Sequence, residues 1–279
     1  MKPIYKKRCI IGEGPIYRES DGRLYFVNPV EAKEICSVRA DGGDPRAIQL
    51  TYSAAAIAFT KDGRILTAGV DGVFMLDETS GEQTPFCDIK GCNDSKVGPD
   101  GAFYVGTQSG KRLGISDAID GKLYRVTADG KATVLLDGLI LSNGMDWSTD
   151  GKLFYHTDSD TGILKEYDFD IATGSISYTG RSVCVPHLDG MTFSESGLIY
   201  VACWGTGHVA VVDSARMEIV KYIDVPVPIP TSCGFFGENM DMLAVTTANY
   251  NDTARANAES GYTFFIKTDT RGKPPYLFG

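Results

Sequence analysis

A turn signal built on Asp-Gly or a related pair recurs along the chain, and this repetition limits the possible fold more than any other feature. The turns lie at positions 21, 62, 100, 150, 196 and 239, separated by 38 to 50 residues. After most of them comes a short run rich in β-branched and aromatic residues, such as Arg23-Leu24-Tyr25-Phe26-Val27, which is typical of a strand. Each repeat has room for four such strands, and four strands in roughly 40–50 residues make one blade of a β-propeller.

The sequence therefore predicts an all-β fold, a six-bladed β-propeller, with residues 1–279 as a single domain. No segment shows the long 3.6-residue periodicity of an amphipathic helix. A pair of β-sandwiches is the competing all-β hypothesis, but similar repeats with no linker between them favour the propeller. Because an unclosed propeller leaves an open sheet edge, residues 4–11 are expected to pair with strands of the sixth blade.

Composition limits the partners and the compartment. The formal net charge of −9 argues against a nucleic-acid surface, which needs a concentrated basic patch. The seven cysteines lack CxxC spacing and are expected to be buried, reduced thiols: Cys9, Cys36, Cys87, Cys92, Cys184, Cys203 and Cys233. The N-terminus lacks the apolar stretch of a secretory signal and no run approaches membrane-spanning length, so a cytoplasmic protein without a membrane partner is expected.

One column of the repeat, seven or eight residues before each turn, is rich in side-chain oxygen atoms. Its members are Glu13, Ala55, Asn93, Asn143, Asp189 and Ser232. The innermost strands of a propeller run in one direction along the axis, so equivalent positions form a ring at one mouth of the channel. Asp and Asn before a strand also commonly cap turns. Four polar side chains converging on one axis nevertheless favour a cation, which relieves the repulsion between crowded carboxylates.

The donor types narrow the choice of cation. Carboxylate and amide oxygens without His or Cys suit one divalent calcium, magnesium or manganese ion, with calcium first and zinc open as an adventitious occupant. The histidines His156, His187 and His208 are too dispersed for a zinc site, and His187 is expected to line the rim of the mouth. The long loops at 107–121 and 247–261 are expected at the same mouth, where lids and specificity elements lie.

Seven short motifs occur in order across essentially the full chain: Gly12-Glu13-Gly14-Pro15, Asn93-Asp94-x-Lys96, Ser142-Asn143-Gly144-Met145-Asp146-Trp147, Asp189-Gly190-Met191, Val201-Ala202-Cys203-Trp204, Pro230-Thr231-Ser232-Cys233 and Arg271-Gly272-Lys273-Pro274. Together they resemble the motifs of the senescence-marker-protein/gluconolactonase family. That resemblance implies a six-bladed propeller with one catalytic divalent cation. It places Glu13, Asn143 and Asp189 on metal-ligand positions, Asp189 also on the general acid/base position, and Asn93 on a position contacting substrate or metal-bound water.

The chain departs from the family pattern at positions that contact substrate. Gly91 stands where sugar-lactonase members often carry Arg, and Ser95 stands where the motif often has Gly. Lys111 and Arg112 in the long loop are candidates to replace the missing cationic contact, with solvated loop charge as the alternative for each. The metal-ligand positions are intact, so the resemblance implies catalysis but leaves an aldonolactone substrate open.

The sequence thus predicts metal-dependent hydrolysis of a small-molecule lactone or related ester. The cation would polarise the carbonyl, Asp189 would exchange protons with water and the ring-opened alkoxide, and Asn93 would position the reacting groups. A non-catalytic, divalent-cation-binding propeller used for ligand or protein binding is the alternative, since fold alone does not decide function. The oligomeric state stays open.

Overall fold

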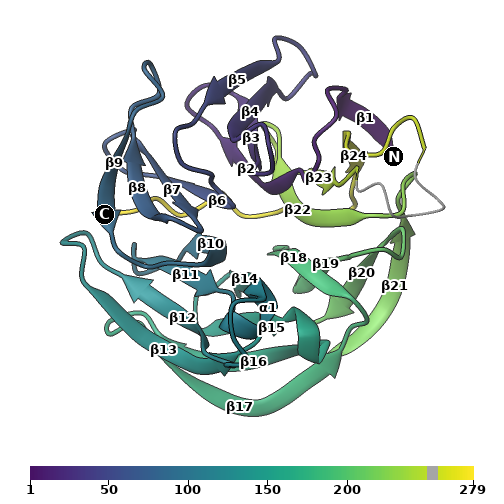
Figure 1. The fold of residues 1–279 in the computed structure, drawn as a ribbon. Helices are drawn as coiled ribbons and strands as arrows, with labels where there is room; N and C mark the ends of the chain where they lie inside the picture. The colour runs from purple at the N-terminus through teal and green to yellow at the C-terminus, as the bar shows by residue number, and fades with distance from the viewer. Residues whose placement is uncertain (250–256) are drawn as a thin grey trace.

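A computed structural model describes residues 1–249 and 257–279. The strands form six four-stranded antiparallel sheets around a central axis, which confirms the predicted six-bladed β-propeller (Figure 1). Neighbouring blades contact each other through their innermost strands β2, β6, β10, β14, β18 and β22. Those strands therefore line the central channel.

The first three blades follow the order of the chain. Blade 1 contains β2 (Glu13–Arg18), β3 (Arg23–Asn28), β4 (Glu34–Arg39) and β5 (Arg46–Gln49). Blade 2 contains β6 (Ala56–Phe59), β7 (Ile65–Gly69), β8 (Gly72–Leu76) and β9 (Gln83–Cys87). Blade 3 contains β10 (Cys92–Val97), β11 (Phe103–Thr107), β12 (Gly121–Val126) and β13 (Ala132–Leu139), with the short helix α1 (Gly110–Leu113) between β11 and β12.

The last three blades repeat this arrangement. Blade 4 contains β14 (Ser142–Trp147), β15 (Leu153–Asp158), β16 (Ile163–Asp170) and β17 (Ser175–Cys184), with the 3-10 helix η1 (Ser159–Thr161) after β15. Blade 5 contains β18 (Leu188–Phe193), β19 (Leu198–Cys203), β20 (His208–Asp213) and β21 (Glu218–Asp224). Blade 6 contains β22 (Pro230–Phe236), β23 (Met242–Thr247), β24 (Thr263–Lys267) and β1 (Lys2–Tyr5).

The N-terminal segment closes the ring as predicted, although the strand that pairs is Lys2–Tyr5, which overlaps the expected residues 4–11 only at Ile4 and Tyr5. β1 pairs antiparallel with β24, with Lys2 opposite Phe265 and Pro3 opposite Phe264 (Figure 1). A further bridge joins Ile11 to Ala248. Strands from the N-terminal and C-terminal parts of the chain therefore share one sheet, which closes the ring of blades.

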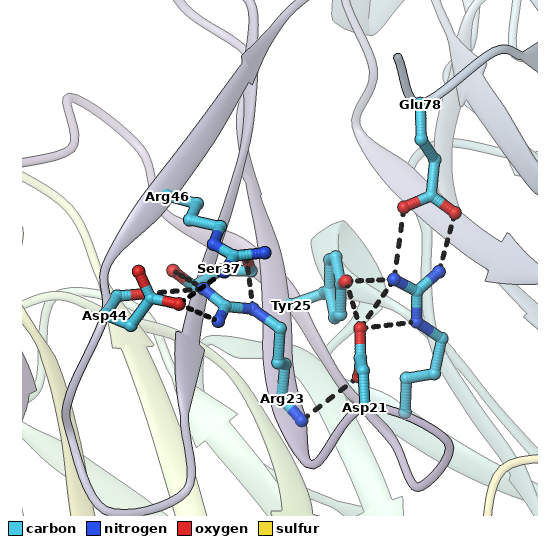
Figure 2. Close-up of polar contacts among 8 residues, drawn as sticks. Asp21, Arg23, Tyr25, Ser37, Asp44, Arg46 and Glu78 are labelled. Atoms are coloured by element: carbon cyan, nitrogen blue, oxygen red, sulfur yellow. Dashed lines mark hydrogen bonds and ion pairs between the residues drawn. The ribbon is translucent and has the colours of Figure 1, made fainter.

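The turns that define the repeat lie at the end of the channel opposite the predicted ring. In five of them a glycine adopts a left-handed φ of 67° to 86°, which a side chain would strain: Gly22, Gly63, Gly101, Gly151 and Gly197. Beside the first turn, Arg18 bonds to Asp21 and reaches Glu78 of blade 2 at 2.6 Å. Figure 2 shows Asp21, Tyr25 and Glu78 converging there, next to a second group formed by Arg23, Asp44 and Arg46.

The C-terminal tail crosses this same end of the molecule, from blade 6 toward β8 and β9 (Figure 1, yellow). Its backbone bonds in turn to blades 5, 2 and 3: Arg271 accepts from Glu195 at 2.8 Å, Phe278 accepts from Lys61 at 3.0 Å, and Gly279 donates to Gly101 at 3.1 Å. The tail therefore ties together blades that are distant in sequence.

All seven cysteines are free thiols. Five are buried as predicted, but Cys87 is half-buried and Cys184 is exposed, so the expectation of burial was wrong for those two. Cys184 ends an outermost strand, where one face of the sheet meets solvent. Among the described residues, no helix is long and apolar enough to span a bilayer.

Candidate functional site

A cavity of about 570 Å³ opens at the mouth of the channel where the innermost strands begin. It is lined by five of the six members of the predicted column, Glu13, Ala55, Asn93, Asn143 and Asp189. The sixth, Ser232, lines a smaller cavity of about 80 Å³ further along the channel. The prediction of one mouth is therefore right for blades 1 to 5 and wrong for blade 6.

A β-bulge at the start of the innermost strand aims these side chains at the cavity. The register between the first and second strands shifts between Glu13 and Ile16, Cys92 and Ser95, Ser142 and Met145, and Leu188 and Met191. A bulge places two residues opposite one and re-aims the side chain that it contains or adjoins. Blade 2 has no such shift and carries Ala55 in the column, so it contributes no oxygen ligand.

Glycines that follow the column residues let adjacent innermost strands approach closely. A Cβ added to Gly144 would lie 2.5 Å from the Asp189 carbonyl oxygen, and one added to Gly190 would lie 2.1 Å from Ser232 Oγ. Real Cβ atoms do not approach other atoms so closely, so only glycine fits. This close approach brings Asn143 Nδ2 within 2.5 Å of Asp189 Oδ1.

The carboxyl groups at the floor of the cavity hold their protons unusually tightly. Burial, followed by the charges of Asp189 and Asp94, raises the pKa of Glu13 well above its usual range. Burial likewise raises the pKa of Asp189 to about 8, although the Asn143 hydrogen bond and Arg112 oppose the shift. Crowded carboxylates in a desolvated site repel each other, and a bound cation removes that repulsion.

The two asparagines add neutral oxygen donors to the carboxylates. Asn143 Nδ2 donates to Ser159 Oγ at 3.0 Å and to Asp189, while Asn93 Nδ2 donates to the Ser142 carbonyl at 3.0 Å. Among the described residues, neither amide oxygen accepts a hydrogen bond, so both are available to a ligand. Glu13, Asn143 and Asp189 thus form a mixed carboxylate and amide oxygen set of the type that binds Ca²⁺ or Mg²⁺. Within residues 1–249 and 257–279, no three His, Cys, Asp or Glu side chains alone form a metal-binding group.

The two predicted cationic contacts behave differently. Arg112 lines the cavity, and its guanidinium lies 3.9 Å from Asp160, which also lines it. Lys111 precedes Arg112 on α1 but is exposed and lies outside the described lining. Ser109 caps the N-terminus of this helix, and its hydroxyl accepts a hydrogen bond from the Arg112 backbone amide at 3.2 Å. His187 lines the cavity, as expected for a rim residue.

Asp94 is a site residue that the sequence analysis did not single out. It lines both cavities, and burial raises the pKa of its carboxyl group while Lys96 lowers it. The acidic residue directly after Asn93 was the available signal. In a regular strand it would face away from the mouth, but the bulge between Cys92 and Ser95 breaks that alternation.

A second charged group fills the channel below Asp94. Asp146 Oδ1 lies 2.7 Å from Lys273 Nζ of the C-terminal tail, and Asp146 Oδ2 lies 3.0 Å from Lys96 Nζ. The Phe193 backbone amide also donates to Asp146, at 2.9 Å. The lower channel is therefore neutralised by the chain's own lysines, in contrast to the mouth.

The fold and the donor set define a class: a six-bladed propeller whose mouth carries carboxylate and amide oxygens around a solvent-accessible cavity. The model of the SMP-30/gluconolactonase/LRE-like region matches residues 11–249. The chain belongs to this family, which confirms the resemblance seen in its motifs.

Its relatives match along nearly their whole length. A protein of Bacillus subtilis named putative sugar lactone lactonase YvrE is 29% identical over 287 residues, covering 97% of this chain and 96% of the relative. Pig regucalcin is 29% identical over 291 residues, covering 99% and 97%. The crystal structure of a calcium-binding protein, regucalcin, from Agrobacterium tumefaciens has a TM-score of 0.89 at 25% identity, covering 100% of this chain and 97% of the other.

Proposed function

We propose that this protein is a divalent-cation-dependent lactonase that opens a small lactone or a related ester. The observation that carries the proposal is the convergence of Glu13, Asn143 and Asp189 at the floor of one cavity, with the pKa of both carboxyl groups raised. A relative named as a putative sugar lactone lactonase supports lactone hydrolysis, and a relative described as a calcium-binding regucalcin supports cation binding. Calcium is the proposed ion, and magnesium, manganese and zinc are the alternatives.

In this proposal Glu13, Asn143 and Asp189 hold the cation through their side-chain oxygens. The bound ion supplies Lewis-acid polarisation of the ester carbonyl. Asp189 accepts a proton from the attacking water and returns it to the alkoxide released by ring opening. Burial raises the pKa of Asp189 to about 8 when no cation is bound, and a bound cation would lower it, which favours the carboxylate form that accepts a proton.

Neighbouring side chains would orient the substrate. Asn93 has its amide nitrogen fixed on the Ser142 carbonyl, so its amide oxygen is held in place to orient water or a substrate hydroxyl. Arg112 is the one Lys or Arg among the described residues that line the cavity, and it would contact an oxygen of the substrate. Lys111 is left out of the proposal because it lies outside that lining.

Asp189→Asn tests the catalytic half of the proposal. The amide keeps an oxygen ligand but cannot accept the proton, and loss of a general base typically lowers kcat by about 10²–10⁴-fold. Hydrolysis is followed by pH indicator on a panel of sugar and non-sugar lactones, with and without EDTA, at saturating cation. Asp241→Asn, on a turn at the far end of the channel, is the matched control and should leave kcat unchanged. Near wild-type hydrolysis by Asp189→Asn at saturating cation would remove Asp189 as the base.

A non-catalytic cation-binding propeller is the second candidate, favoured by the calcium-binding description of the Agrobacterium regucalcin. The two functions differ in one result. Calcium binding by calorimetry, with no turnover of any lactone in the panel by the wild-type protein, would support the binding function and contradict the lactonase. EDTA-sensitive turnover would decide for the enzyme.

A further inference from the structure

The lining of the mouth cavity differs sharply between its two sides. Beyond Glu13 at the floor, blades 1 and 2 contribute Pro29, Val30, Ser53, Ala55 and Val70, and among the described residues none of these is ionisable. Blades 3 and 4 instead contribute Gln108, Arg112, Ser159 and Asp160 above their asparagines. The side of the cavity formed by blades 1 and 2 is therefore mainly apolar, whereas the side formed by blades 3 and 4 carries polar and charged groups beside Cys92 and Leu141.

The apolar wall presents branched side chains to the open part of the cavity. Val30 is 36% exposed and Val70 is 47% exposed. Each lies in the short loop between the second and third strands of its blade, after β3 and after β7. Exposed aliphatic side chains gain free energy when a ligand removes them from water, at about 25 cal/mol per Å² of apolar surface.

The loops that carry this wall are fixed by hydrogen bonds. Ser53 Oγ donates to the Pro29 carbonyl at 2.8 Å, which joins the loop of blade 1 to the entry of blade 2. The Gly91 backbone amide donates to the Val70 carbonyl at 3.0 Å, which joins the loop of blade 2 to blade 3. The wall is thus preformed, and binding to a preformed wall avoids the entropy of ordering a loop.

We propose that the cavity selects lactones with an apolar substituent and that Val30 and Val70 determine this specificity. The inference rests on the proposed lactonase function and names its substrate class. With the ester carbonyl at Glu13, Asn143 and Asp189, a substituent on the ring extends along the wall of blades 1 and 2. A polyhydroxylated ring would lose hydration against that wall without gaining hydrogen bonds, which disfavours it.

A kinetic series tests the inference. Wild-type kcat/KM is measured for δ-valerolactone, for its 5-alkyl derivatives from methyl to hexyl, and for glucono-δ-lactone. Each methylene that reaches the wall should raise kcat/KM by about three- to fourfold, the value expected for transferring one buried methylene from water. Glucono-δ-lactone should be hydrolysed less efficiently than the longer alkyl lactones.

The double variant Val30→Thr, Val70→Thr keeps the side-chain shape and makes the wall polar. It should reduce the gain to below about twofold per methylene. Val134→Thr, Val220→Thr is the matched control, because these valines are 45% and 47% exposed on the outer strands β13 and β21. That control should reproduce the wild-type series.

Calorimetry with the corresponding δ-lactams separates this inference from the lactonase proposal, because lactams resist hydrolysis. Affinity that rises with alkyl length in the wild type and not in Val30→Thr, Val70→Thr supports the apolar wall even if no lactone is turned over. Lactone turnover that does not depend on alkyl length, or that is fastest with glucono-δ-lactone, would refute the proposed specificity for apolar substituents. The lactonase proposal would still hold in that case. Lactam affinity that does not change with alkyl length would refute the proposed specificity for apolar substituents, whether or not the protein turns over lactones.

Discussion

Replacing Asp146 by Asn should destabilise the propeller strongly, because this carboxylate is the shared partner of two lysines inside the channel. Its side chain is 4% exposed, and Lys273 and Lys96 lie at 2.7 Å and 3.0 Å. Burial alone would raise the pKa of Asp146, yet the two lysines hold it well below its usual range. The amide would remove the one carboxylate that forms ion pairs with these two ammonium groups among the described residues.

The expected size of the effect follows from the burial of the partners. Removing one member of a buried ion pair typically costs about 3–5 kcal/mol in the free energy of unfolding, because the remaining charge is uncompensated. Lys273 is 14% exposed, so Asp146→Asn falls in that range. Asp241→Asn removes the partner of Lys267, which is 77% exposed at 3.3 Å, and should cost less than about 1 kcal/mol.

Urea unfolding at pH 7, followed by circular dichroism, measures both variants against the wild type. The pH dependence gives a second measure. A carboxyl group whose folded pKa is depressed stabilises the protein above its unfolded pKa of about 3.9, and this contribution is lost as the pH falls further. The gap between wild type and Asp146→Asn should therefore narrow below about pH 4. Equal destabilisation by the two variants, or a gap that does not change in acid, would refute the reasoning.

Two further predictions concern the mouth and the core. Glu13→Gln should weaken Ca²⁺ binding by at least about tenfold in calorimetry, because a neutral amide replaces a charged ligand. Glu195→Gln, on a distant turn, is the control and should bind Ca²⁺ like the wild type. Unchanged Ca²⁺ affinity in Glu13→Gln would remove Glu13 from the ligand set. Burial lowers the pKa of His156 to about 3, and the ring contacts Ser142 Oγ at 2.8 Å. The unfolded chain then takes up a proton that the folded protein rejects, so this one group should lower the free energy of unfolding by about 1.4 kcal/mol per pH unit below about pH 6.5. The difference between wild type and His156→Gln in urea titrations isolates that contribution from the opposing contributions of Asp189 and Glu13.

The architecture was predictable because it follows from local signals that repeat. Each turn fixes where one strand ends and the next begins, and six similar units leave the propeller as the arrangement that buries all of them. Closure through the N-terminal segment was also predictable, since a propeller that is not closed leaves an open sheet edge. The outer strand is Lys2–Tyr5, which begins before the expected segment 4–11 and shares only Ile4 and Tyr5 with it.

The ring of site residues was predictable only where the strand register is regular from blade to blade. In blade 6 the register shifts between Pro230 and Ser232, so counting back from the turn selected a residue that faces the inner cavity. Asp94 was missed for the related reason that a bulge breaks the strict alternation of faces. A column count assumes equal register in every blade, and bulges change register without a clear mark in the sequence.

Long-range contacts of the tail were outside the reach of sequence patterns. Lys273 belongs to a motif that signalled the family, but nothing local shows that it enters the channel beside Asp146. The choice between Lys111 and Arg112 was similarly undetermined, because it depends on the direction in which the four-residue helix α1 presents its side chains. Both outcomes are decided by packing between segments that lie far apart along the chain.

The two ends of the channel differ in whether lysine side chains of the protein pair with their buried carboxyl groups. At the lower end, Lys96 and Lys273 neutralise Asp146 permanently, and that end is covered by the chain's own tail. At the mouth, Glu13 and Asp189 carry raised pKa values, and the one Lys or Arg in the described lining is engaged with Asp160. Carboxyl groups that have no cationic partner in the protein, at an open cavity, can be ionised and paired by a cation that binds there. The contrast supports the cation site proposed at the mouth and indicates a structural role for the charged group at the lower end.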